Sequence, residues 1–206
     1  MKTIIDVNKW ERAEHFSFFR TFLDPMIGLT TNVVCERFKR IGSGEKPNFL
    51  LPLHAILKAV NETEAFRYRI DKDGRVCIYD RIDAFAPMIL QGTKGYRTLL
   101  FRYYADRDQF IVEARKTMET ASATAVFGVE AEVEEYNQVL VSCLPNIKFT
   151  ALQQGLIKAG GEHFPIITID KQDSDGMPMN VYVDHTFVDL HDTSVFINRV
   201  VEHLYE

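Results

Sequence analysis

The segment NVYVDHTFVDLHD, residues 180–192, places two histidines and three aspartates where an alternating apolar run gives way to a helical pattern. Catalytic groups are often carried at such positions, because a strand supports them rigidly. A neutral imidazole there can act as a general base near physiological pH. His185, which directly follows the alternating run, is therefore a candidate base. The alternative is a histidine that is only hydrogen-bonded at the edge of the core.

Asp189 lies four residues after His185. An extended chain rises about 3.3 Å per residue, so the two groups stand about 13 Å apart unless the segment turns. Direct pairing therefore requires a bend. Otherwise Asp189 organises the turn through an arginine or backbone donors, while another group fixes the imidazole tautomer. The alternative is that Asp189 only caps or turns the chain.

The side chains of His185, Asp189 and His191 are also of the types that bind zinc or iron. The spacing H-x-x-x-D-x-H does not place all three on one face of a regular element. No second cluster elsewhere in the chain would complete a four-coordinate site. The sequence therefore predicts no metal site at this turn.

Ser142 lies in the segment VSCLPN, at the end of another alternating run. This segment is not a nucleophile elbow, which needs glycines on both sides of the serine, so attack by Ser142 is disfavoured. As a hydroxyl donor to a developing oxyanion it remains a candidate, and its place near a strand end would let it approach His185. Cys143 would point to the opposite face of the strand, which favours a position in the core.

Composition predicts one folded domain over residues 1–206, with 46% hydrophobic residues, 15 Phe and 8 Tyr. The net charge of -5, without a basic run, argues against a nucleic-acid partner. The first residues hold no apolar stretch typical of a secretory signal, and no segment is apolar for long enough to span a membrane. The three cysteines, Cys35, Cys77 and Cys143, are dispersed along the chain, which argues against a disulfide framework or a zinc knuckle. We therefore expect a cytoplasmic protein.

Hydrophobic periodicity predicts the elements that must position these groups. Helical patterns cover residues 8–23, 50–61, 106–124 and 192–206, the last with Asp192 or Thr193 as its cap. Alternating patterns predict strands over 28–38, 96–105, 138–144, 164–170 and 179–185, and the turn KDG predicts a hairpin within 68–80. This order predicts an α+β fold: a two-layer sandwich whose mixed, mainly antiparallel sheet is covered by helices on one side.

Four segments give the chain a family resemblance over nearly its whole length. They are I-D-x-x-x-W-x-R-x-E-H-F at 5–16, S-x-L-P at 142–145, P-I-I-T at 165–168 and F-I-N-R at 196–199. In order and approximate spacing they resemble the chloramphenicol acetyltransferases. The signature H-H-x-x-x-D-G of that family reads D-H-x-x-x-D-L here, at 184–190. The resemblance implies the fold of a CoA-dependent acyltransferase.

The resemblance also implies a function and roles for individual residues. The protein would be an acetyl-CoA-dependent O-acetyltransferase that acts by direct transfer on chloramphenicol or a similar small hydroxyl compound. His185 would be the general base, and Asp189 would pair with Arg12. Ser142 would stabilise the oxyanion, and Thr168 would help to bind the transition state through water. Aromatic positions of the acceptor pocket match Phe18, Phe19 and Tyr96.

By the same resemblance, acetyl-CoA is a co-substrate and no cofactor is bound permanently. The assembly would be a homotrimer with active sites between subunits, in which His185 of one subunit faces an acceptor pocket built largely by its neighbour. Such an enzyme would confer resistance to the antibiotic.

Three residues depart from the family pattern: Asp184 replaces the first histidine of the signature, Leu190 its glycine, and Asn146 a common tryptophan. If the glycine requires a positive φ, Leu190 would be strained or the turn rebuilt. A D-H-x-x-x-D-G pattern also occurs in the acyltransferases of 2-oxo acid dehydrogenases. Two alternatives therefore stay open: an acyltransferase for another acceptor, and a family member that binds a ligand without efficient catalysis.

Overall fold

The computed structural model describes residues 1–34, 49–89, 94–121, 136–154, 164–170 and 175–205. The main sheet contains, in spatial order, β2 (Met26–Val33), β9 (Met177–Asp184), β8 (Ile166–Asp170), β7 (Gln138–Leu144), β5 (Asp83–Ile89) and β6 (Tyr96–Phe101). A small sheet contains β1 (Lys2–Ile4), β4 (Val76–Tyr79) and β3 (Tyr68–Ile70). The helices are α1 (Ala13–Phe19), α3 (Leu50–Glu62), α4 (Arg107–Thr120) and α5 (Leu190–Tyr205), with 3-10 turns η1 (Val7–Lys9) and η2 (Glu64–Arg67).

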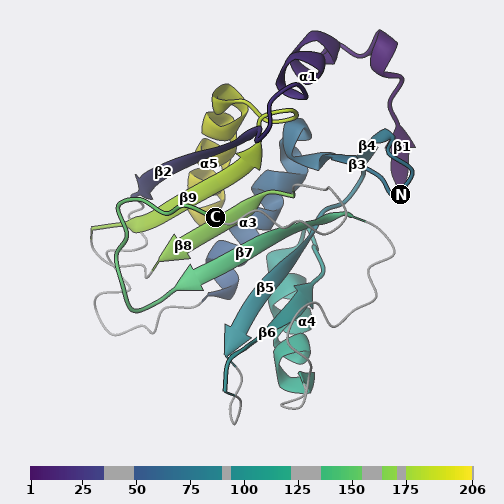
Figure 1. Ribbon diagram of the computed structural model, residues 1–206. Helices are drawn as coiled ribbons and strands as arrows, with labels where there is room; N and C mark the ends of the chain where they lie inside the picture. Colours follow the sequence, from purple (N-terminus) through teal and green to yellow (C-terminus); the bar gives the residue numbers. More distant parts are fainter. Residues whose placement is uncertain (35–48, 90–93, 122–135, 155–163, 171–174, 206) are drawn as a thin grey trace.

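The main sheet is mixed. Strand β7 runs parallel to β5 and β8, while β2–β9, β8–β9 and β5–β6 are antiparallel. Helices α3, α4 and α5 lie on one face of this sheet, and α3 packs between the other two (Figure 1). The predicted α+β sandwich with a mainly antiparallel sheet is confirmed.

Alternation along the central strands separates the core from the opposite face of the sheet. The side chains that face the helices are almost fully buried: Val139, Val141, Ile167, Ile169, Met179, Val181 and Val183. Burial of each such side chain stabilises the fold by about 1.5–3 kcal/mol. Because successive side chains point to opposite faces, Ser142, Thr168 and Asn180 lie on the side away from the helices, which we call the open face.

The N-terminal helix predicted over 8–23 is wrong in extent. A 3-10 turn begins after Asp6, whose carboxylate accepts from the Asn8 N–H at 3.2 Å, and the chain then straightens at Trp10. The indole of Trp10 packs on Tyr68, 4.8 Å between ring centroids, and donates to its hydroxyl. This tertiary contact interrupts the helical pattern, and α1 starts only at Ala13.

Strand β5 was missed because it contains Pro87, which lacks an N–H and usually marks an edge or a break. The ladder with β7 ends at Phe85, and Pro87 pairs only with Thr98 of β6. The proline therefore lies beyond the last residue that pairs on the β7 side. Strand β1, with three residues, is too short to produce a recognisable pattern.

The predicted hairpin is confirmed, with β3 and β4 paired around a turn at Gly74, whose φ is 78°. The strand predicted over 28–38 is β2, which begins at Met26, and residues 35–38 of the prediction lie outside the described part of the chain. The last three residues of the helix predicted over 106–124 lie outside it too. Within the described ranges, no helix combines the length and the apolar character needed to cross a membrane.

Candidate active site

The turn after β9 is organised by Asp184. Its carbonyl accepts from the N–H groups of Phe187 and Val188, each at 3.0 Å. Its carboxylate accepts from the Thr186 N–H at 2.8 Å and from the Thr186 hydroxyl. Asp184 is only 5% exposed, so this departure from the family signature is a structural part of the turn that carries His185.

His185 is held by residues from the N-terminal part of the chain. Its N–H donates to the carbonyl of Pro25 at 2.8 Å, and its own carbonyl lies 2.5 Å from Nε2 of His15. Its ring stacks on Phe19, with 3.7 Å between centroids and 20° between planes. Nδ1 of His185 is buried and has no hydrogen-bond partner among the described residues, which leaves Nε2 as the candidate atom for proton transfer.

Arg12 meets two carboxylates at the start of α5. Its Nη2 lies 3.8 Å from Asp189, the partner that the family resemblance implied, but only 2.7 Å from Asp192. The sequence pattern indicated Asp192 only as a possible helix cap and did not predict this contact. The available signal was the spacing of two acidic residues three positions apart, which resembles a capping box.

The helix begins earlier than predicted because Asp189, not Asp192 or Thr193, is its cap. The carboxylate of Asp189 accepts from the Asp192 N–H at 2.7 Å, and that of Asp192 accepts from the Asp189 N–H at 3.1 Å. Partial burial opposes ionisation of Asp189. The backbone N–H groups of Asp192 and His191, together with the charge of Arg12, outweigh it and hold the pKa of Asp189 below its ordinary value.

Leu190 is the first residue of α5 and is 55% exposed. None of the described non-glycine residues has a positive φ, so Leu190 adopts an ordinary conformation. The strain considered for this substitution does not arise. The turn closes through the reciprocal bonds of Asp189 and Asp192 without a glycine.

A row of polar side chains crosses the open face. Ser142 of β7 is paired with Thr168 of β8, and Thr168 with Asn180 of β9. Gln154 donates to the Thr168 hydroxyl at 2.8 Å, and Asn180 donates to the carbonyl of Leu152 at 3.1 Å. These bonds fasten the segment after β7 onto the open face.

A cavity of about 520 Å³ opens beside Ser142. Its walls are mostly apolar, and Tyr96 lies at its edge with 43% of its surface exposed. The other lining residues are Phe85, Pro87, Ile89, Thr98, Leu140, Cys143, Leu144 and Phe164. Cys143 also packs against the core, and burial, aided by the charge of Asp170, raises the pKa of its thiol to about 11.

The structure divides the predicted site residues into two groups. Phe18 and Phe19 lie beside His185, since Phe18 packs edge-on against Phe19 with 5.0 Å between centroids. Tyr96 lies with Ser142 instead. Asn180 lies on β9, five residues before His185, which directly follows that strand; this corresponds to about 16 Å of extended chain. Ser142 lies a further two strands away, about 10 Å across the sheet.

Comparison with known proteins identifies the family. The chloramphenicol acetyltransferase family model matches residues 1–201. The chain belongs to the chloramphenicol acetyltransferase family. Chloramphenicol acetyltransferase 3 of Escherichia coli is 30% identical over 208 residues, which cover 97% of this chain and 95% of that protein. Chloramphenicol acetyltransferase 2 of Escherichia coli is 27% identical over 205 residues, 96% of this chain and 94% of that protein.

Solved structures agree with this assignment. A chloramphenicol acetyltransferase structure matches 99% of this chain and 100% of its own, with a TM-score of 0.87 and 34% identity. A probable dihydrolipoamide acetyltransferase from Listeria monocytogenes matches 98% of this chain and 93% of its own, with a TM-score of 0.62 and 13% identity, and so shares the fold alone. The expected fold and family, an acyltransferase family that uses acetyl-CoA, are confirmed.

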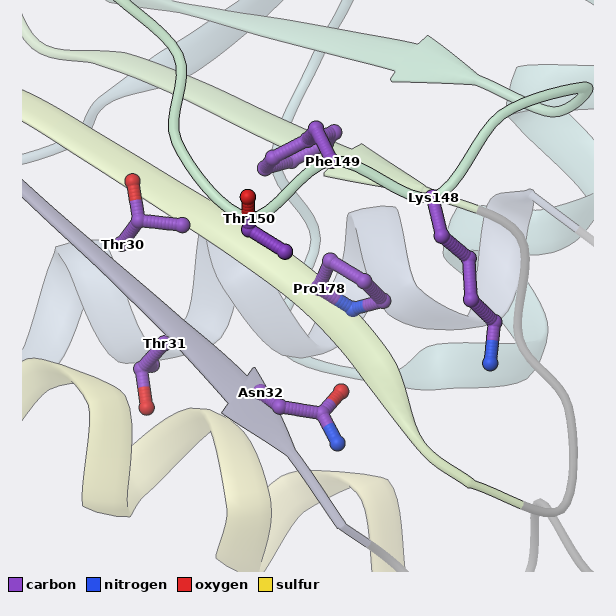
Figure 2. A pocket seen from close by; sticks show the side chains of 7 residues that line it. All are labelled: Thr30, Thr31, Asn32, Lys148, Phe149, Thr150 and Pro178. Carbon is purple, nitrogen blue, oxygen red and sulfur yellow. The ribbon is translucent and has the colours of Figure 1, made fainter.

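A second cavity, of about 320 Å³, also borders the open face. Figure 2 shows Phe149 and Thr150 on one side of it and Thr30 and Asn32 of β2 on another. Asn32 donates to the carbonyl of Asp175 at 2.6 Å, and Lys148 forms an ion pair with the same residue at 3.5 Å. Asn32 and Lys148 are thus both joined to Asp175 at the rim of this cavity.

Among the residues that the structure describes, no group of three or more His, Cys, Asp or Glu side chains is arranged to hold a metal ion.

Proposed function

We propose that this protein transfers the acetyl group of acetyl-CoA to a hydroxyl group of chloramphenicol. The observation that carries this proposal is the family match over residues 1–201, with the histidine of the family signature retained as His185. The imidazole of that histidine, directly after the strand β9, suits the base that such a transfer requires.

The reaction proceeds in one covalent exchange. Nε2 of His185 takes the proton from the acceptor hydroxyl while the hydroxyl oxygen attacks the thioester carbonyl carbon of acetyl-CoA. The tetrahedral intermediate then collapses, the carbon–sulfur bond breaks, and the departing CoA thiolate takes the proton back from His185. No acyl-enzyme forms. A positioned base of this kind contributes about 10²–10⁴-fold to the rate.

The developing oxyanion is stabilised by the Ser142 hydroxyl, and Thr168 assists through a water molecule. Their pairing on adjacent strands supports a joint role, because both hydroxyls face the same side of the sheet. Loss of one oxyanion donor typically costs about 10²–10³-fold in kcat.

Arg12, Asp189 and Asp192 support the base. The guanidinium joins α1 to the first turn of α5, and this contact holds Phe19 against the imidazole. An aromatic face stacked on the ring restricts its rotation, which is what a general base needs to meet its substrate in one geometry.

The acceptor lies in the cavity beside Ser142. Its volume of about 520 Å³ is within the range of small-molecule sites, and its apolar walls suit the nitrophenyl ring of chloramphenicol. Tyr96 and Thr98 are the polar groups at its wall besides Ser142.

The complete active site forms between subunits of a homotrimer. Within one chain, His185 and Ser142 lie too far apart to act on the same hydroxyl. Close to His185, α1 and the following residues expose apolar side chains that a second copy would cover: Phe18 is 60% exposed, Phe22 46%, and Leu23 completely. In the trimer, His185 of one copy faces the cavity of the next.

The test is an acetyl-transfer assay that follows release of the CoA thiol. Wild-type protein should release CoA in the presence of chloramphenicol, and His185→Gln should abolish this release. His191→Gln, an exposed histidine in the first turn of α5, serves as the matched control and should remain active. The proposal fails if folded wild-type protein releases no CoA with chloramphenicol, and acetylation of dihydrolipoamide in its place would favour the other acceptor class.

The reaction takes place in the cytoplasm, where acetyl-CoA is available, and it protects the cell from the antibiotic. Expression in a susceptible bacterium should allow growth on chloramphenicol, and expression of His185→Gln should not.

A further inference from the structure

Helix α1 meets the turn of His185 with one face. Arg12, His15 and Phe19 are spaced by three and four residues, which places them on the same side of the helix. Arg12 reaches the start of α5, and Phe19 covers the imidazole. His15 lies between them and has no part in the reaction described above.

His15 contacts the base through its backbone. Its Nε2 lies 2.5 Å from the carbonyl oxygen of His185, and because a carbonyl only accepts, Nε2 carries the proton of this bond. The His15 ring is half-buried, 4.8 Å from the ring of Phe19 and 5.4 Å from that of His185. With the bond from the His185 N–H to Pro25, both backbone polar groups of the base are therefore engaged.

We infer that His15 is a positioning residue for His185, and this inference rests on the proposed function. The bond from His15 fixes the peptide group between His185 and Thr186. It thereby fixes the backbone of His185 and the direction in which its imidazole ring points. A general base must lie within about 2.6–3.2 Å of the proton that it takes. A displacement of about 1 Å is enough to cost about 100-fold in rate.

Two variants whose side chains have the same shape distinguish the effect of the hydrogen-bond donor of His15 from the effect of its volume. His15→Gln keeps an N–H that can reach the carbonyl, whereas His15→Glu, ionised above pH 7, keeps the shape and loses the donor. We expect His15→Glu to lower kcat about 10- to 100-fold at an unchanged KM for acetyl-CoA, and His15→Gln to stay within about threefold of wild type. Ser17→Glu, which adds a carboxylate at an exposed position of the same helix, controls for the added negative charge.

A second measurement does not depend on activity. The ¹³C chemical shift of the His185 carbonyl, read through the N–H of Thr186, reports the hydrogen bond directly. It should move in His15→Glu and stay in His15→Gln. If wild-type protein does not acetylate chloramphenicol, the proposed function fails. The carbonyl chemical shift still tests whether His15 holds the backbone of His185, because it does not depend on activity.

Equal kcat values in His15→Gln and His15→Glu would overturn the inference, and so would a carbonyl shift that both variants leave unchanged. If His15→Glu does not fold, His15→Met, which fills similar space without a donor, takes its place with the same expected loss.

Discussion

Mixing two inactive variants tests whether one active site is built from two chains. His185→Ala removes the proposed base and Ser142→Ala the proposed oxyanion donor, and each is expected to lower kcat by at least about 100-fold. On one chain these residues are separated by about 16 Å along β9 and about 10 Å across the sheet. Neither variant can therefore repair its own site.

In a cyclic trimer, each interface takes His185 from one copy and Ser142 from the next. After equal amounts of the two variants are unfolded and refolded together, about a quarter of the interfaces combine an intact histidine with an intact serine. Thiol release per chain should therefore recover to about 25% of the wild-type rate.

The assay compares this mixture with each variant refolded alone. A mixture of His185→Ala and His185→Gln controls for any effect of mixing itself, because neither chain carries the base. If the mixture of His185→Ala and Ser142→Ala has only the mean activity of its two components, the intersubunit site is refuted.

Three further predictions concern the support of the site and its surroundings. Asp192→Asn should lower the free energy of unfolding in urea by about 1 kcal/mol and by more than Asp189→Asn, because Asp192 makes the shorter contact with Arg12 and asparagine is itself a good helix cap. Equal losses would contradict this. Because burial raises the pKa of Cys143 to about 11 from 9.0, iodoacetamide at pH 8 should alkylate it roughly 100-fold more slowly than in the unfolded chain, as followed by mass spectrometry. Burial also lowers the pKa of His54 below 6.5, although its hydrogen bond to the Tyr104 carbonyl opposes this. The unfolded chain then binds the extra proton, so the stability due to this group should be lost as pH falls below 6.5; His54→Gln should reduce the slope of stability against pH, and an unchanged slope would exclude this cause.

Local patterns were sufficient for much of the fold. Alternation predicted β7, β8 and β9, and a turn sequence predicted the hairpin of the small sheet, because both signals lie within a few neighbouring residues. The family signature located His185 for the same reason. The same signature does not show which distant residues contact His185.

Contacts between distant segments could not be predicted in this way. Whether Ser142 lies near His185 depends on the register of β7, β8 and β9, and no single strand carries that information. The pairing of Arg12 with Asp192 spans 180 residues. The bond from His15 could not be predicted either, because a backbone carbonyl accepts it and every residue has such a carbonyl, whatever its side chain.

The closure of the turn at Leu190 has a consequence for how such proteins are recognised. A search that requires the full signature H-H-x-x-x-D-G would pass over this chain, although its second histidine and its aspartate are retained as His185 and Asp189. Here the turn closes through two carboxylates, Asp189 and Asp192, each bonded to the backbone of the other. A pattern that accepts Asp at the first position, and an acidic residue three positions after the last aspartate in place of the glycine, would include this chain.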